Sequence, residues 1–99
     1  MIHIKGNNGV SLATGLNYYL KYFCNVNISQ VGDQVSMPES IVPVEGTVHK
    51  ETTFPVRYSY NYCTLSYSMA FWGEEEWRNE LDWLALNGVN VVLDATAQE

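Results

Sequence analysis

The stretch GEEEWRNELDWLALNGVNVVLD (Gly73–Asp94) predicts a helix followed by a buried strand. Its three opening glutamates, Glu74–Glu76, suit the first turn of a helix, because acidic side chains there interact favourably with the helix dipole. Gly88 is the residue type that most often ends a helix, so we expect the helix to run to Asn87.

The helix has one apolar stripe, and the segment after it is apolar on both faces. We expect Trp77, Leu81, Leu84 and Ala85 to form the buried side of the helix, because their spacing places them on one face. The run VNVVLD that follows is almost continuously apolar, which is typical of a parallel-sheet strand covered by helices.

The segment before this helix is RYSYNYCTLSYSMAFW (Arg57–Trp72), which is rich in aromatic residues and carries a formal charge only at Arg57. Its first part, Tyr58–Thr64, is expected to be extended. Strand, helix and strand then make one parallel βαβ unit, whose crossover should be right-handed. Residues 57–99 hold this unit and stop just past its second strand, so the chain looks truncated.

The N-terminal part predicts a strand and then a helix. IHIKG places Ile2 and Ile4 on one face of a short strand, by the alternation of strand side chains. Ser11 is the expected N-cap of the helix. The apolar residues of that helix recur at helical spacing: Leu12, Leu16, Tyr19, Leu20 and Phe23.

A β-hairpin is expected next, in NVNISQVGDQVSM, where apolar residues alternate around a Gly32–Asp33 turn. Prolines make Pro38–Pro55 resemble a linker, with at most one short edge strand near Thr47–Lys50. The chain is therefore predicted to be α/β, with a β-α-β-β block over residues 1–50 and the βαβ unit over residues 57–99.

Composition limits the classes of partner. A hydrophobic fraction of 46% is that of a globular chain, and the formal net charge of −6 argues against nucleic acids and anionic membranes as partners. The N-terminus has no signal-peptide pattern. No stretch approaches the roughly twenty apolar residues of a membrane-spanning helix, so membrane insertion is not expected.

Polar residues follow both strands of the predicted βαβ unit. Asn61, Cys63 and Tyr67 lie at the end of the first strand and in the loop after it. The second strand is followed by another polar set: Asp94, Thr96, Gln98 and Glu99. Ligands of parallel α/β folds bind at the carboxyl ends of the strands, and aromatic rings with a few amides and hydroxyls suit a sugar. The alternative is that the aromatic residues only pack between two domains.

Catalysis, metal binding and cofactors find no support in the residue pattern. Glycoside hydrolysis needs two carboxyl groups, and Asp94 and Glu99 are the only candidates at this face, but neither can be assigned a role. Cys63 has no histidine nearby to activate it, and the two histidines lack metal-ligand spacing. Cys24 and Cys63 fall in different blocks, so we expect two free thiols.

The run Arg57–Glu99 resembles the alpha-N-acetylglucosaminidase family of glycoside hydrolases. The similarity lies in N-x-C-T-x-S-Y-S at Asn61–Ser68, in the aromatic and acidic helix start, and in DWLALNGVN followed by a hydrophobic strand and QE. The preceding GNNGVSLATGLNYYLKYFCNVNIS is similar to the small N-terminal α/β domain of that family. The resemblance spans nearly all 99 residues.

For the fold, the resemblance implies a small N-terminal α/β domain followed by the first βαβ unit of a TIM barrel. For the activity, it implies an exo-acting, retaining hydrolase that removes terminal alpha-linked N-acetylglucosamine from a glycan. The two catalytic glutamates of the family lie on later barrel strands, so this chain alone should be inactive. Full-length members of the family are typically secreted or lysosomal.

The resemblance also implies that Asn61, Cys63 and Tyr67 bind substrate, because they match residues in the pocket wall of the family. The family often has a glycine before the Gln-Glu pair, whereas this chain has Ala97, so Gln98 and Glu99 are given no role. Two other interpretations stay open: a stand-alone, non-catalytic α/β module that binds a carbohydrate or a protein, and a truncated product without function. The oligomeric state is not indicated.

Overall fold

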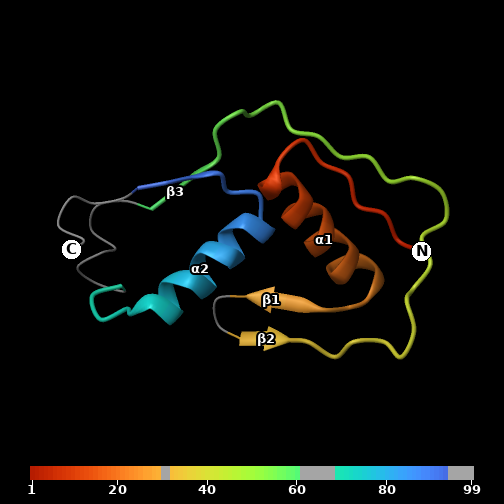
Figure 1. Ribbon diagram of the computed structural model, residues 1–99, viewed down its shortest axis with the longest axis horizontal. Helices are drawn as coiled ribbons and strands as arrows, with labels where there is room; N and C mark the ends of the chain where they lie inside the picture. Colours follow the sequence, from red (N-terminus) through yellow and green to blue (C-terminus); the bar gives the residue numbers. More distant parts are fainter. Residues whose placement is uncertain (30–31, 61–68, 94–99) are drawn as a thin grey trace.

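The computed structural model describes residues 1–29, 32–60 and 69–93. Within them, two helices pack against each other, and in the view of Figure 1 a small sheet lies on either side of helix α2. The fold class is α/β, as predicted. The elements in chain order are α1 (Gly9–Phe23), β1 (Asn27–Ser29), β2 (Gly32–Gln34), β3 (Tyr58–Ser59), α2 (Glu74–Leu86) and β4 (Val91–Val92).

Helix α1 begins earlier than the sequence suggested, and its N-cap is Asn8 rather than Ser11. The Ser11 backbone N–H donates to Asn8 Oδ1 at 2.9 Å, and the Ser11 hydroxyl donates to Asn7 Oδ1 at 2.6 Å. Asparagine and serine are about equally good caps, so residue type alone did not separate the two positions. The predicted cap at Ser11 was wrong.

Residues 1–6 form no strand, which contradicts the prediction for Ile2 and Ile4. The segment runs beside α1 (Figure 1), and a Cβ added at Gly15 would lie 2.8 Å from Ile4 Cγ2. Both isoleucines are half-buried. Alternation of side chains places them correctly on one face, but a strand also needs a hydrogen-bonded neighbour, and no described strand pairs with this segment.

A hairpin follows α1, as predicted, but its turn lies elsewhere. Strand β1 pairs antiparallel with β2, with Ser29 opposite Gly32, so Gly32 and Asp33 belong to the second strand rather than to the turn. Asp33 lies opposite Ile28 in the ladder, and its side-chain Oδ1 also accepts a hydrogen bond of 3.1 Å from the Ser29 N–H. The predicted turn position at Gly32–Asp33 was wrong.

The long connection after β2 is irregular from residue 35 to residue 57, and the edge strand predicted near Thr47–Lys50 is not formed. The Tyr19 hydroxyl fastens this connection to α1 by donating to the Val42 carbonyl at 2.7 Å. An edge strand requires a sheet edge to pair with, and that requirement cannot be read from local composition.

The predicted βαβ unit is confirmed. Strand β3 pairs parallel with β4, with Tyr58 opposite Val91, and α2 connects them. The helix ends at Leu86, one residue before the predicted Asn87, which is its C-cap. Gly88 follows with φ at 84°, and the Val89 N–H donates back to the Leu84 carbonyl at 2.9 Å. Residues 61–64 of the predicted first strand lie outside the described residues.

The buried face of α2 differs from the predicted one. Leu84 is 3% exposed and Trp77 is half-buried, as expected, but Leu81 is 44% exposed and Glu80 is 7% exposed. Glu80 and Leu81 lie three and four residues after Trp77, and both spacings place a side chain near the face of Trp77. Leu81 was chosen because glutamate is polar. The assignment of Leu81 to the stripe was therefore wrong.

The two halves of the chain meet where α1 packs on α2. The Thr14 hydroxyl donates to the Ala85 carbonyl at 3.2 Å, and the Trp83 indole N–H donates to the Ile28 carbonyl at 3.2 Å. These contacts join residues far apart in the sequence, and they hold the N-terminal block on the βαβ unit.

Arg57 joins the end of the long connection to the end of α2. Its Nε donates to the Gly88 carbonyl at 2.5 Å, and its Nη1 donates to the Phe54 carbonyl at 2.6 Å. Its backbone N–H donates to Asn90 Oδ1 at 2.8 Å, and Asn90 Nδ2 donates to the Pro55 carbonyl at 3.0 Å. This network fixes the start of β3 beside the start of β4.

The described chain buries little apolar surface for its size. Its radius of gyration is 15.7 Å, against about 13 Å for a compact domain of 100 residues. The buried apolar residues are Cys24, Val26, Met69 and Leu84. Large apolar side chains remain exposed on both helices and on β4: Leu12, Leu16, Leu81, Val91 and Val92. Neither described helix is long and apolar enough to cross a membrane.

We expect the substitution Arg57→Ala to lower the free energy of unfolding by about 2 kcal/mol, because hydrogen bonds of a charged group are lost from a partly buried site. Urea unfolding followed by tryptophan fluorescence measures this difference. The matched control is Arg78→Ala, which removes only an exposed ion pair with Glu74 and should cost about 0.5 kcal/mol or less. Equal losses in the two variants would contradict the role given to Arg57.

The thiol of Cys24 is free and buried at the end of α1, as predicted, whereas Cys63 lies outside the described residues. In a Cys63→Ser variant, Cys24 should therefore react slowly with a thiol reagent in buffer and rapidly in denaturant. Absorbance of the released reporter gives both rates. Equally fast reaction under both conditions would show that the α1 terminus does not protect the thiol.

Candidate functional site

The carboxyl ends of β3 and β4 meet at one edge, because the two strands are parallel. The chain leaves this edge at Tyr60 and at Leu93, and the Leu93 N–H still donates to the Ser59 carbonyl at 3.2 Å. Asn61 follows Tyr60 directly, and Asp94 follows Leu93. The last described residues before the two predicted polar sets thus lie at the same edge of the sheet, where ligands of parallel α/β folds bind.

The predicted site residues themselves lie outside the described residues. This holds for the three predicted substrate-binding residues, Asn61, Cys63 and Tyr67. It holds equally for the polar set after the second strand: Asp94, Thr96, Gln98 and Glu99. The geometry given below is therefore that of the described residues close to them in the sequence or at the same edge of the sheet.

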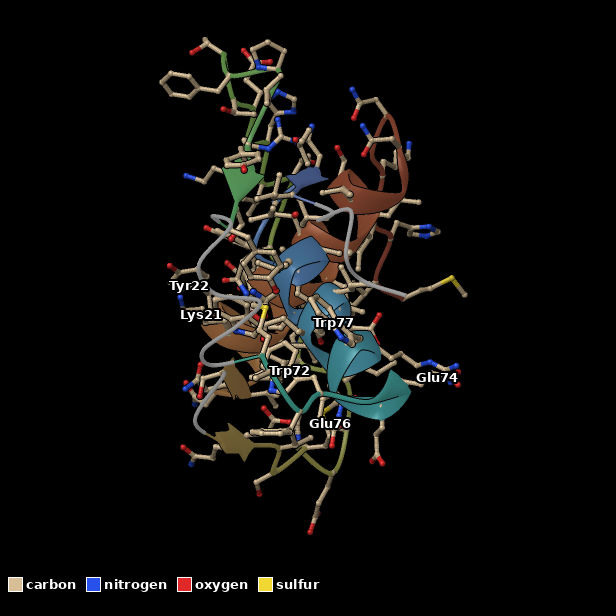
Figure 2. The ribbon with its side chains drawn as sticks, turned by 90° about the vertical axis from the view of Figure 1, so that its left-hand side faces the viewer. Lys21, Tyr22, Trp72, Glu74, Glu76 and Trp77 are labelled. Atoms are coloured by element: carbon tan, nitrogen blue, oxygen red, sulfur yellow. The ribbon has the colours of Figure 1, made fainter. Side chains whose placement is uncertain are left out.

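An aromatic cluster of Tyr60, Trp72 and Trp77 lies at this edge. The Tyr60 and Trp77 rings are 6.3 Å apart at 84°, and the Trp72 and Trp77 rings are 5.3 Å apart at 79°. Figure 2 shows the two labelled indoles next to each other at the beginning of α2. Edge-to-face contacts of this kind hold rings in a defined orientation, so the cluster fixes the end of β3 against α2.

Glu80 lies one helical turn after Trp77, on the same face of α2, and its side chain is buried. Burial raises the pKa of the Tyr60 hydroxyl above its ordinary value, and the neighbouring Glu80 carboxylate raises this pKa further. The Tyr60 hydroxyl is buried, and it makes no hydrogen bond to another described residue. Tyr60 therefore stays protonated at physiological pH, beside an acidic neighbour.

The backbone of Tyr60 is also unusual, with φ at 80°. Asn25 is the other non-glycine residue with positive φ in the described ranges, and asparagine adopts this region far more readily than tyrosine. A bulky residue persists in such a conformation only where its surroundings hold it there. Sequence reasoning missed Tyr60 and Glu80, and the available signal was a glutamate at helical spacing between Trp77 and Leu84.

The glutamates at the start of α2 have a structural role, as the sequence suggested. Glu74–Glu76 are exposed, and Glu76 Oε2 accepts a hydrogen bond of 2.9 Å from the Gly73 N–H. Glu74 pairs with Arg78 at 2.6 Å in an exposed ion pair one turn further on. Among residues 1–29, 32–60 and 69–93, no group of three His, Cys, Asp or Glu side chains could hold a metal ion.

Packing between the two halves was the alternative interpretation of the aromatic segment. In the described part of the chain, that seam consists of α1 and α2 with the hydrogen bonds of Thr14 and Trp83. Tyr58 and Phe71, which flank the undescribed residues 61–68, are both exposed, Phe71 at 98%.

Comparison with known families finds two matching models from one family. Residues 1–44 match the alpha-N-acetylglucosaminidase (NAGLU) N-terminal domain, and residues 57–99 match the alpha-N-acetylglucosaminidase (NAGLU) TIM-barrel domain. The human alpha-N-acetylglucosaminidase is 38% identical over 98 residues, which cover 99% of this chain and 13% of the human protein.

Solved structures give the same result. A family 89 glycoside hydrolase from Clostridium perfringens, in complex with 2-acetamido-1,2-dideoxynojirmycin, is 49% identical over 95% of this chain, with a TM-score of 0.90. A variant of this enzyme with two glutamates changed to glutamine, in complex with its substrate GlcNAc-alpha-1,4-galactose, is 50% identical over 91% of the chain, with a TM-score of 0.88. The chain covers 11% and 10% of these two proteins.

Both blocks of the chain match the same enzymes in sequence, and the solved relatives match it in fold. The chain spans only about a tenth of the length of those relatives. It belongs to the alpha-N-acetylglucosaminidase family of glycoside hydrolases.

Proposed function

We propose that residues 1–99 are a part of an exo-acting, retaining enzyme that removes terminal alpha-linked N-acetylglucosamine from glycans. The observation that carries this proposal is that the identity to the family 89 glycoside hydrolase, 49%, extends over 95% of the chain and therefore over both blocks. A module recruited for another purpose would have no reason to keep both blocks and the seam between them. No described contact favours the alternative of a stand-alone binding module.

The part of the reaction that falls to this chain is substrate binding. Asn61 follows the end of β3, and its amide can both donate to and accept from a sugar hydroxyl or an acetamido group. Tyr67 offers a ring face and a hydroxyl, and Cys63 offers a small side chain for the pocket wall. The aromatic cluster of Tyr60, Trp72 and Trp77 supports this edge from below.

The groups that break the glycosidic bond lie outside residues 1–99 in this proposal. Retaining hydrolysis requires a carboxylic acid that protonates the leaving oxygen and a carboxylate nucleophile, about 5 Å apart. The described acidic residues do not supply such a pair at the strand edge, because Glu74–Glu76 are exposed on α2 and Glu80 lies in its buried stripe.

The isolated chain should therefore not hydrolyse an aryl alpha-N-acetylglucosaminide. Binding residues without an acid and a nucleophile provide no route for the proton transfer that the leaving group needs. Release of the chromophore by purified residues 1–99, compared with a buffer blank and with the Clostridium perfringens relative, measures this. Turnover above the blank that survives repeated purification would place catalytic groups within the chain.

The complete enzyme, in which residues 1–99 are joined to a catalytic part of the length found in the relatives, tests the site. There, Asn61→Ala should lower kcat/KM by about ten-fold and leave the melting temperature nearly unchanged, because one hydrogen bond to the substrate is lost. Kinetics on the aryl glycoside and a thermal melt of the same preparation give both quantities. A lower melting temperature with unchanged kinetics would make Asn61 a structural residue instead.

A further inference from the structure

Phe71 is 98% exposed, more than any other large apolar side chain among the described residues except that of Met1. Burial is what makes an aromatic side chain stabilise a fold, so a phenyl ring in water contributes little to the stability of this one. A single exposed apolar residue is common on protein surfaces. The exposure of Phe71 is therefore informative only together with the way its backbone is held and with its place in the fold.

The backbone at Phe71 is fixed on both sides. Residues 69–71 form a turn, in which the Trp72 N–H donates to the Met69 carbonyl at 3.2 Å. The Met69 side chain is buried, and the Trp72 ring lies 5.3 Å from that of Trp77 in an edge-to-face contact. The turn thus packs Met69 and Trp72 against the chain and leaves the Phe71 ring in solvent. A ligand that binds a ring on an ordered turn loses little free energy to ordering it.

The turn lies in the connection from β3 to α2, on the side of the sheet where both parallel strands end. In Figure 1, the beginning of α2 and the carboxyl ends of β3 and β4 all lie toward the left of the view. Loops at the carboxyl ends of parallel strands bind the ligands of this class of fold. An exposed ring in this connection therefore lies where a substrate can reach it.

We propose that Phe71 binds the second sugar of the substrate, the one that carries the terminal N-acetylglucosamine, by stacking its ring on the C–H face of that sugar. The inference rests on the proposed function. An exo-acting enzyme encloses the terminal sugar, whereas the rest of the glycan extends into solvent and is contacted from one side. A ring exposed at 98% offers one open face and encloses nothing, which suits the second sugar. In the substrate bound to the Clostridium perfringens relative, GlcNAc-alpha-1,4-galactose, the second sugar is galactose.

The experiment compares two substrates in the complete enzyme. One is GlcNAc-alpha-1,4-galactose, and the other is alpha-N-acetylglucosaminyl fluoride, which has the same terminal sugar but no second sugar. Phe71→Ala should lower kcat/KM for the disaccharide by about five-fold, because the stacking contact is lost, and should leave kcat/KM for the fluoride unchanged. Phe71→Tyr, which keeps an aromatic face, should retain normal kinetics on both substrates.

The matched control is Phe54→Ala. Phe54 is another exposed phenylalanine, at 70%, but it lies in the long connection before β3 and therefore toward the other end of that strand. Its backbone carbonyl accepts from Arg57 Nη1, and the substitution leaves that carbonyl in place. This variant should keep normal kinetics on both substrates. Melting temperatures, measured on every variant, report separately on stability.

The outcomes separate this inference from the function on which it rests. Normal kinetics of Phe71→Ala on the disaccharide, or equal losses on both substrates, would overturn the role of Phe71 and leave the proposed function standing. A lower melting temperature with an unchanged ratio of the two kcat/KM values would also overturn it, because the ring would then pack against the catalytic part of the enzyme. If the enzyme with Phe71 intact hydrolyses neither substrate, the proposed function fails, and this inference fails with it.

Discussion

The alignment of β3 with β4 depends on the hydrogen bonds that Arg57 makes with the chain after α2. The Arg57 carbonyl accepts from the N–H groups of Asn90 and Val91 at 3.0 and 3.2 Å, while its side chain reaches the Gly88 carbonyl. These bonds start the two strands at the same level. Because the strands are parallel and in register, they also end at the same level, and Tyr60 and Leu93 leave the sheet as neighbours.

The hydrogen bonds of Arg57 lie at the start of β3, and the edge at which Tyr60 leaves the sheet lies at its end. Different interactions stabilise these two ends. At the start of β3, two backbone carbonyls accept from the charged side chain of Arg57, and the Asn90 amide oxygen accepts from its backbone N–H. At the edge, rings packed edge-on and a buried carboxylate surround a tyrosine with positive φ. The hydrogen bonds of Arg57 favour one arrangement of the strands. The edge at Tyr60, in contrast, contains backbone strain and a buried carboxylate. Proteins retain such costs chiefly where a side chain must be held in one orientation.

Part of this structure followed directly from local sequence signals. The stop at Gly88, the acidic start of α2 and the parallel partner for the extended segment each depend on one residue or on one short pattern. The strand expected at Ile2 and Ile4 failed because pairing is a property of two segments, and alternation describes only one of them.

The candidate site was less accessible to the same reasoning. Asn61, Cys63 and Tyr67 were proposed from their place after a strand and from a family resemblance, since nothing in their spacing dictates sugar binding. Glu80 was overlooked because a pattern search assigns glutamate to the solvent side of a helix, and only the packing of Trp77 and Leu84 shows that this glutamate faces inward. Functional sites often contradict local sequence patterns in this way, because they keep residues that are unfavourable for the stability of the fold.

The contacts between the two halves have a consequence for how the chain acquires its structure during synthesis. The Thr14–Ala85 and Trp83–Ile28 hydrogen bonds span 71 and 55 residues. When α1 and the hairpin leave the ribosome, the surface that will cover them has not yet been translated. At about 5–20 residues per second, the wait for α2 lasts several seconds, which is long compared with helix formation. The N-terminal half therefore spends that interval with its apolar side uncovered, and α2 completes it late.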